Sequence, residues 1–198
     1  MPAIILASGS KIRAELLENA NLDFSVTLPR VDEEAIKSSL LAESFSPRDV
    51  ADALAEIKSQ KVSAKNPTAL VIGADQVLDF SGTIVSKPKD KGDAITQLSQ
   101  MRGQRHMLWS AAVISQNGKP IWRFVGQVRL YMRQVSDSYL EHYVDRNWQE
   151  IQHCVGAYQM EKEGSRLFSK IEGDYFSILG LPLLEILNYL ALRGDIEG

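Results

Sequence analysis

Several residues that could act on a charged ligand lie where short apolar runs end. The stretch 69–78, ALVIGADQVL, has four apolar residues that lead through Gly73 and Ala74 to Asp75. A buried carboxylate that has no partner costs several kcal/mol. We therefore expect Asp75 to end a core strand, and either to cap local backbone or to bind a positively charged group.

A second group of such residues follows the apolar run 3–7. The next residues, SGSKIR, form a loop that opens a helix, so backbone amides and the hydroxyls of Ser8 and Ser10 can bind an anion there. Lys11 and Arg13 add positive charge. A serine at this position is more often only a helix cap, so the loop predicts an anion site only together with other residues.

Three consecutive acidic residues, Asp32, Glu33 and Glu34, are a further source of charge. Such a run is typical of a solvated surface or of a helix start. Beside Asp75, the same residues could instead supply oxygen ligands for Mg²⁺ or Mn²⁺, which favour carboxylates, water and substrate phosphate. The spacing does not decide between these interpretations.

Two lysines complete the candidate group. Lys58 lies in a predicted helix, and Lys87 is followed by Pro88, which favours an extended backbone and restricts the direction of the Lys87 side chain. Most lysines are solvated surface groups, so neither residue indicates a site without the others.

The elements that must position these residues alternate between strands and helices. The run 3–7 predicts a strand followed by a helix, and a Ser-Pro pair predicts a long helix over 47–63 that leads to the strand containing Asp75. Further along, the pattern predicts a turn at Ser81–Gly82 with a short strand, a helix over 93–101, two antiparallel strands around Asn117–Gly118, a helix over 138–146 capped by Ser136, and a C-terminal helix starting at Pro182. We expect a mixed α/β sheet covered by helices and elongated into two lobes around a cleft.

Length and composition limit the class of protein. The 198 residues, 44% hydrophobic, can form a single domain over 1–198 with a substantial core. The net charge of −3 gives no general attraction to a nucleic acid polymer. One cysteine, no signal-like N-terminus and no long apolar segment predict a cytoplasmic protein that does not enter the membrane.

Seven blocks of this sequence, taken together and in order, resemble the Maf family of nucleotide pyrophosphatases. They are LASGSKIRAELL, VDEEAI, AEIKSQK, IGADQVL, SKPKD, RGQRHMLWSA and IEGDYFSILGLPLL, and they extend over nearly the whole chain. The resemblance implies an elongated α/β fold related to the inosine triphosphate pyrophosphatases. It also implies metal-dependent hydrolysis of a nucleoside triphosphate to the monophosphate and pyrophosphate, with water attacking the α-phosphorus.

The resemblance assigns roles to the candidate residues. Asp75 becomes the proton acceptor or metal-held carboxylate that prepares the attacking water, and Glu33 and Glu34 bind Mg²⁺ or Mn²⁺ with it. Lys58 and Lys87 hold the triphosphate, and together with Asp75 and Glu33 they are the catalytic residues. The substrate-binding residues are Ser8, Ser10 and Arg13, which contact phosphates, and Gln76, which helps to read the base.

Two departures from the family pattern bear on substrate preference. Many members have Pro-Arg-Arg after the second serine, where this chain has Lys11, Ile12 and Arg13. Many also have Asp-Lys before Gly-Ala-Tyr, where this chain has His153 and Cys154, which we interpret as structural residues.

Two other functions remain open at this point. The protein could be a nucleotide-binding regulator of cell division and septum formation with little turnover, or a sensor that keeps the triphosphate site. The resemblance also suggests a homodimer, whereas the preferred base does not follow from the sequence.

Overall fold

The computed structural model describes residues 2–197, which form one seven-stranded mixed sheet covered by helices. The strand order is β2-β1-β3-β5-β6-β7, and β4 pairs with β3. The strands are β1 (Ile4–Ala7), β2 (Ser25–Val26), β3 (Leu70–Phe80), β4 (Thr83–Val85), β5 (Arg105–Gln116), β6 (Lys119–Met132) and β7 (Phe168–Glu172). The α-helices are α1 (Lys11–Asn19), α2 (Glu33–Ala42), α3 (Pro47–Ser63), α4 (Lys91–Met101), α5 (Asp137–Ile151), α6 (Tyr175–Ile178) and α7 (Leu183–Arg193), with 3-10 turns η1 (Val155–Ala157) and η2 (Glu163–Leu167).

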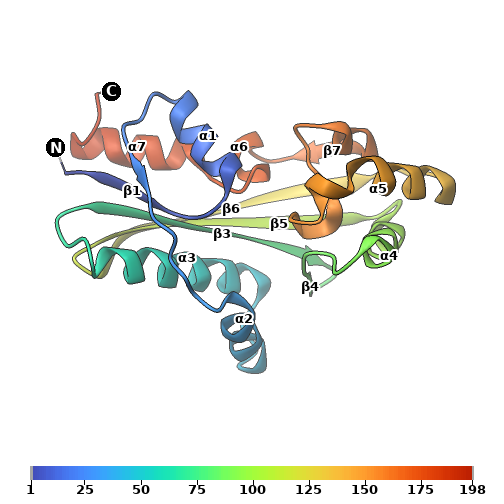
Figure 1. The fold of residues 1–198 in the computed structure, drawn as a ribbon, viewed down its shortest axis with the longest axis horizontal. Helices are drawn as coiled ribbons and strands as arrows, with labels where there is room; N and C mark the ends of the chain where they lie inside the picture. Colours follow the sequence, from blue (N-terminus) through green and yellow to red (C-terminus); the bar gives the residue numbers. More distant parts are fainter. Residues whose placement is uncertain (1, 198) are drawn as a thin grey trace.

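The long strands β3, β5 and β6 run along the molecule and connect two lobes (Figure 1). One lobe packs α1 and α7 on one face of the sheet and α3 on the other, and the second lobe contains α4, α5 and β7. The lobes have separate cores: Leu6, Leu17, Ile72 and Ile186 belong to the first, and Leu98, Leu108, Leu140 and Val144 to the second. The expected elongated α/β fold is confirmed.

Local signals in the sequence explain the elements that were predicted. Ser46 caps α3 by accepting the Asp49 amide, and Pro47 occupies the first helical turn. The β5–β6 hairpin turns at Asn117 and Gly118, which both have positive φ, as this type of turn requires. Ser136 caps α5, which continues to Ile151, beyond its predicted end.

The expectation that a strand ends at Asp75 is wrong. β3 continues to Phe80, because the Asp75 charge has a cationic partner and the apolar residues Val77 and Leu78 carry the strand onward. Pro182 lies just before α7 instead of in its first turn. The sequence analysis also did not identify α2, β2 and β7, which contain few buried residues.

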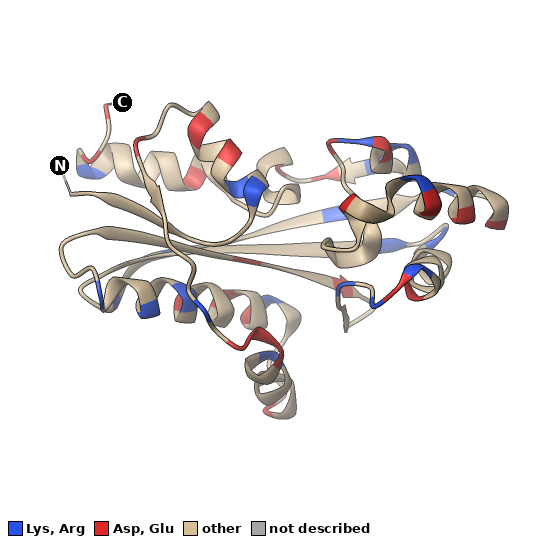
Figure 2. Ribbon diagram, in the orientation of Figure 1, with Lys and Arg blue, Asp and Glu red and all other residues tan. Residues whose placement is uncertain are grey.

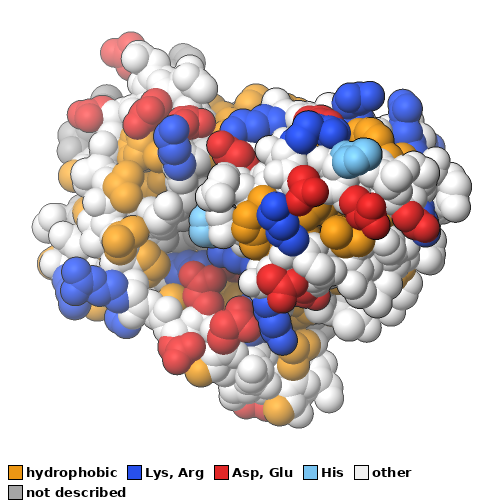
Figure 3. All heavy atoms as spheres, turned by 45° about the vertical axis from the view of Figure 1, so that its right-hand side comes forward, with side chains coloured by type: hydrophobic (Ala, Val, Ile, Leu, Met, Phe, Trp, Pro, Cys, Tyr) orange, Lys and Arg blue, Asp and Glu red, His pale blue; other side chains and the backbone are white. Residues whose placement is uncertain are grey.

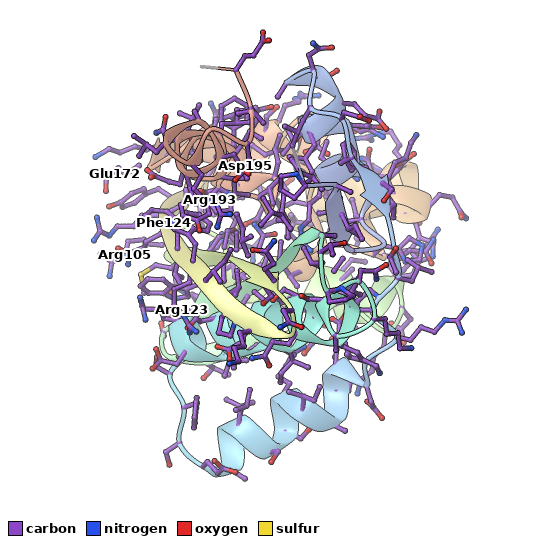
Figure 4. The ribbon with its side chains drawn as sticks, turned by 90° about the vertical axis from the view of Figure 1, so that its left-hand side faces the viewer. Arg105, Arg123, Phe124, Glu172, Arg193 and Asp195 are labelled. Carbon is purple, nitrogen blue, oxygen red and sulfur yellow. The ribbon has the colours of Figure 1, made fainter. Side chains whose placement is uncertain are left out.

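Viewed from one end, the sheet lies between α1 and α7 on one side and α3 on the other, and α2 projects beyond α3 (Figure 4). Arg123 of β6 helps to fasten α3 to the sheet, since it forms ion pairs with Asp52 at 2.7 Å and Glu56 at 2.6 Å. Among residues 2–197, no helix is both long and apolar enough to cross a membrane.

Candidate active site

The candidate residues meet at a gap beside β3. On one side of this strand, β1 pairs as far as Gly73, and β4 begins to pair at Leu78. Within residues 2–197, positions 74–77 therefore have no neighbouring strand on this side, although β5 pairs with them on the other. The loop after β1 lies at one end of the gap and the segment after β4 at the other. A hollow that contains acidic and basic side chains is visible between the lobes (Figure 3).

Asp75 lies on the stretch of β3 that borders this gap and is only 6% exposed. Its Oδ1 atom is 2.6 Å from Lys58 Nζ, which α3 carries under the sheet. The same Nζ atom is 2.8 Å from Glu33 Oε1, at the start of α2. The acidic residues of the first turn of α2 are red in Figure 2. One buried ammonium group thus joins two carboxylates that lie far apart in the sequence.

The close packing of α3 on β3 makes this ion pair possible. A Cβ atom at Gly73 would lie 2.2 Å from the Ala55 carbonyl oxygen and 2.6 Å from the Ser59 amide nitrogen. Only glycine allows this approach. Ser59 Oγ is also hydrogen-bonded to Ser115 Oγ of β5 at 2.7 Å, which ties the helix to the sheet one residue after Lys58.

The charges shift the two carboxyl groups in opposite directions. Burial raises the pKa of Asp75 above its usual value, and the attraction of Lys58 and Arg13 offsets this only in part. Burial also raises the pKa of Glu33, but the cations around this carboxyl together lower it by more. Lys58, Lys87 and Arg13 therefore hold the pKa of the Glu33 carboxyl below its usual value. Asp75 is the carboxylate better suited to accept a proton.

Arg13 is buried, and its guanidinium group mainly binds the protein itself. Nε donates to the Gly180 carbonyl oxygen at 2.7 Å, and Nη1 donates to the Ala74 carbonyl oxygen at 2.8 Å and to Ser8 Oγ at 3.3 Å. Ser8 Oγ also accepts the Ser10 amide at 3.2 Å. Burial lowers the pKa of Arg13, against the influence of Asp75. The predicted phosphate loop is thus held in place by Arg13.

The remaining predicted site residues differ in position. Lys87 is exposed and close enough to Glu33 to affect the pKa of its carboxyl. Glu34 is not brought to the site: its side chain is 75% exposed and pairs with Lys37 at 3.0 Å. Gln76 lies on the face of β3 opposite Asp75, and its side-chain amide nitrogen donates hydrogen bonds to the protein.

Glu33 and Asp75 are the residues that could hold a metal ion. No group of three or more His, Cys, Asp or Glu side chains in the described part of the chain is arranged around a metal position. Two carboxylates that converge on one cation nevertheless fit Mg²⁺ or Mn²⁺, which commonly take one or two carboxylates and complete their coordination with water and substrate phosphate.

Sequence reasoning missed the residues that position the site. Gly73 permits the close packing of α3, and the Gly180 carbonyl oxygen accepts a hydrogen bond from Arg13. Ser110 and Ser177 accept hydrogen bonds from the Gln76 side chain. A glycine inside an apolar strand is a signal of close backbone approach, and Gly73 could have been identified from it. The other contacts depend on the fold.

A model of the family described as Maf-like protein matches residues 3–192. The chain belongs to this Maf-like family. A Ruegeria pomeroyi protein named nucleoside triphosphate pyrophosphatase is 63% identical over 194 residues, which cover 98% of each chain. A Caulobacter vibrioides protein of the same name is 48% identical over 193 residues, covering 98% of this chain and 96% of its own.

Of the two departures from the expected pattern, the first, at Lys11 and Ile12, lies at the start of α1, and the second, at His153 and Cys154, lies just after α5 in the second lobe. His153 is exposed, whereas Cys154 is partly buried and its Sγ contacts the Glu150 carbonyl oxygen at 3.7 Å. Burial raises the pKa of Cys154 to about 11, so the thiol stays protonated at neutral pH.

Proposed function

We propose that this protein hydrolyses nucleoside triphosphates to nucleoside monophosphates and pyrophosphate. The observation that carries the proposal is the buried Lys58–Asp75 ion pair, shared with Glu33, on the stretch of β3 that borders the gap. The names of the Ruegeria and Caulobacter relatives support the same activity. Phosphoryl transfer needs mainly positioning and charge stabilisation, and this arrangement supplies both.

In this proposal, Asp75 accepts a proton from the water that attacks the α-phosphorus. The water oxygen forms a bond to phosphorus, the bond to the bridging oxygen breaks, and pyrophosphate leaves with the electron pair. Lys58 orients the Asp75 carboxylate, and Lys87 stabilises charge on the phosphates. The loop with Ser8 and Ser10 binds phosphate oxygens, and Arg13 fixes that loop.

A divalent ion is part of the proposal. Glu33 and Asp75 would hold Mg²⁺ or Mn²⁺, which neutralises charge on the phosphates when bound. Glu34 contributes least, since it points to Lys37. We further propose a single catalytic domain over 1–198 in a cytoplasmic homodimer, a setting supported by the single cysteine for the compartment and by the family resemblance for the dimer.

Pyrophosphate release from a panel of standard and modified nucleoside triphosphates tests the proposal. We expect release with Mg²⁺ or Mn²⁺ and none with a chelator, and the panel identifies the preferred base. Binding of nucleotides without release from any of them would contradict the enzyme and favour a regulator or sensor.

A further inference from the structure

The side-chain amide nitrogen of Gln76 is occupied by the protein. Its Nε2 atom donates to Ser110 Oγ at 3.0 Å and to the carbonyl oxygens of Ser177 and Ile178 at 3.0 and 2.9 Å. Ser110 Oγ donates to the Ser177 carbonyl oxygen at 2.6 Å, so it is an acceptor toward Gln76. These three acceptors fix the orientation of the amide and occupy both of its N–H groups, so neither N–H group is left to donate to a nucleotide base.

The main-chain N–H and C=O groups of Gln76, unlike its side-chain amide nitrogen, do not face a neighbouring strand within residues 2–197. Backbone N–H and C=O groups of alternate residues in a strand point to opposite neighbours. In β3 the N–H and C=O groups of the even-numbered residues point toward β1 and β4. The Leu70 N–H group donates to the Ala3 carbonyl oxygen, and the Ala74 carbonyl oxygen accepts a hydrogen bond from Arg13. Leu78 is already opposite Val85 of β4.

Gln76 is the next even-numbered residue after Ala74. Its N–H and C=O groups therefore point into the gap between β1 and β4, where no strand of the described residues 2–197 lies opposite them. This N–H group directly follows Asp75 in the chain, and the Ser8–Arg13 loop and Lys87 mark the ends of the same gap.

We infer that Gln76 acts on the substrate through its main-chain N–H group, which donates a hydrogen bond to a nonbridging oxygen of the α-phosphate. The side chain is a positioning group that anchors this peptide to Ser110 and to the residue 177–178 backbone. The inference rests on the proposed hydrolysis. A fixed N–H donor aimed at an oxygen that gains negative charge lowers the barrier without reorganisation.

Replacing the Asp75–Gln76 amide by an ester tests the donor directly. An α-hydroxy analogue of glutamine at position 76 keeps the side chain, replaces the N–H group by an oxygen atom and makes the Asp75 carbonyl oxygen a weaker acceptor. We expect kcat for the preferred nucleotide to fall about 100-fold, as for other donors to a developing oxyanion. The melting temperature should change only a little, because no hydrogen bond of the sheet is lost and only the bond of the Asp75 carbonyl oxygen to β5 is weakened.

The matched control is the same ester at Val77, whose N–H group points to Trp109 of β5. This ester should lower the melting temperature and leave kcat within about twofold of wild type, since it removes a ladder bond outside the gap. An active wild type together with a fully active Gln76 ester would overturn the inference alone. An inactive wild type would instead overturn the proposed function.

Stereoisomers of an α-thio nucleotide provide a readout that a structural defect would not move. The isomer with sulfur facing the Gln76 N–H group should be the slower substrate of the wild type, because sulfur is a weak acceptor. This difference should shrink in the Gln76 ester and persist in the Val77 ester. An unchanged difference in both would contradict a contact to the α-phosphate.

The side-chain part of the inference is tested with Gln76→Leu across the nucleotide panel. Loss of the anchor should lower kcat about tenfold for every base and leave the ratios between bases within about threefold of wild type. Altered ratios with an unchanged kcat for the best nucleotide would show that the side chain reads the base, against the inference.

Discussion

Asp75 and Asp79 lie on the same face of β3, and both are almost completely buried, at 6% and 5% exposure. Their partners differ. Asp75 contacts the ammonium group of Lys58, which also binds Glu33. Asp79 accepts hydrogen bonds from two neutral donors, the Gly82 amide at 2.7 Å and Trp109 Nε1 at 3.3 Å.

The comparison separates the carboxylate that we propose to be reactive from a structural one. The Asp79 partners are fixed by the β3–β4 turn and by the neighbouring strand, so this carboxylate closes a hairpin and has no group that a ligand could replace. The Asp75 partner is instead an ammonium group that also pairs with Glu33 beside the gap, so a metal ion bound by these two carboxylates would compete with it. Burial alone does not distinguish the two residues.

The largest expected effect comes from Asp75→Asn. This substitution keeps the shape and removes the proton acceptor, so pyrophosphate release should fall about a thousand-fold. The protein should still unfold cooperatively, because Lys58 keeps its pair with Glu33. The matched variant Asp79→Asn should lose about 1–3 kcal/mol of unfolding free energy and keep its activity within a fewfold. If the two variants lost activity equally, the distinction between these carboxylates would be wrong.

The next largest loss of activity is expected from substitution of Gly73, near Asp75, and not of Gly82, whose amide binds Asp79. Gly73→Ala places a methyl group against the α3 backbone, so α3 must shift and carry Lys58 away from Asp75. We expect kcat to fall more than tenfold and stability to fall about 2 kcal/mol. In the control, Gly82→Ala, nothing lies within 4 Å of the new methyl group, and only the positive φ of 84° is unfavourable. It should cost about 1 kcal/mol and leave kcat unchanged. Equal kcat values in both variants would rule out a positioning role for Gly73.

The pH profile provides a third test. Since burial raises the pKa of Asp75, kcat/KM should decrease with falling pH already above pH ~4, the usual value for an aspartate. In Lys58→Met this decrease should begin at higher pH, because the largest attraction that lowers the Asp75 pKa is gone.

Stability should respond to the same proton in the opposite sense. The folded protein binds a proton at Asp75 more tightly than the unfolded chain does, so the contribution of this group to the unfolding free energy grows as pH falls through the folded pKa. Denaturant titrations of wild type and Asp75→Asn over that range check the sign. A wild type that loses stability relative to the variant as pH falls would contradict a raised pKa.

The smallest effect is expected at Glu34. Glu34→Gln should change pyrophosphate release less than twofold, since this exposed side chain pairs with Lys37. Its neighbour provides the contrast: Glu33→Gln should lower release more than tenfold and raise the Mg²⁺ concentration needed for half-maximal rate. A tenfold loss in Glu34→Gln would return that residue to the metal site.

The sequence predicted the parts of the fold that local signals encode. Pro47, the Asn117–Gly118 pair and Ser136 each fix a turn or helix start through their own backbone preferences. β2 and β7 lack such signals because their residues are mostly exposed and pair only at the sheet edges. α2 escaped notice for a related reason, since none of its residues is buried.

The site was predictable only in its residue types. Asp75, Glu33 and Lys58 were all expected, but the sequence does not reveal that one ammonium group joins them. Neighbouring residues on a helix point about 100° apart, and this separates Glu34 from Glu33. The strand could continue past Asp75 because Lys58, 17 positions away, compensates its charge.

The hydrogen bond between Arg13 and Gly180 joins residues separated by 167 positions. At roughly 5–20 residues per second, the ribosome needs on the order of ten seconds or more to make the segment between these two residues. The loop with Ser8 and Ser10 is therefore made well before Gly180, which holds its Arg13 anchor. A chain cut short before residue 180 therefore lacks this anchor, and its Ser8–Arg13 loop is held only by contacts to earlier residues.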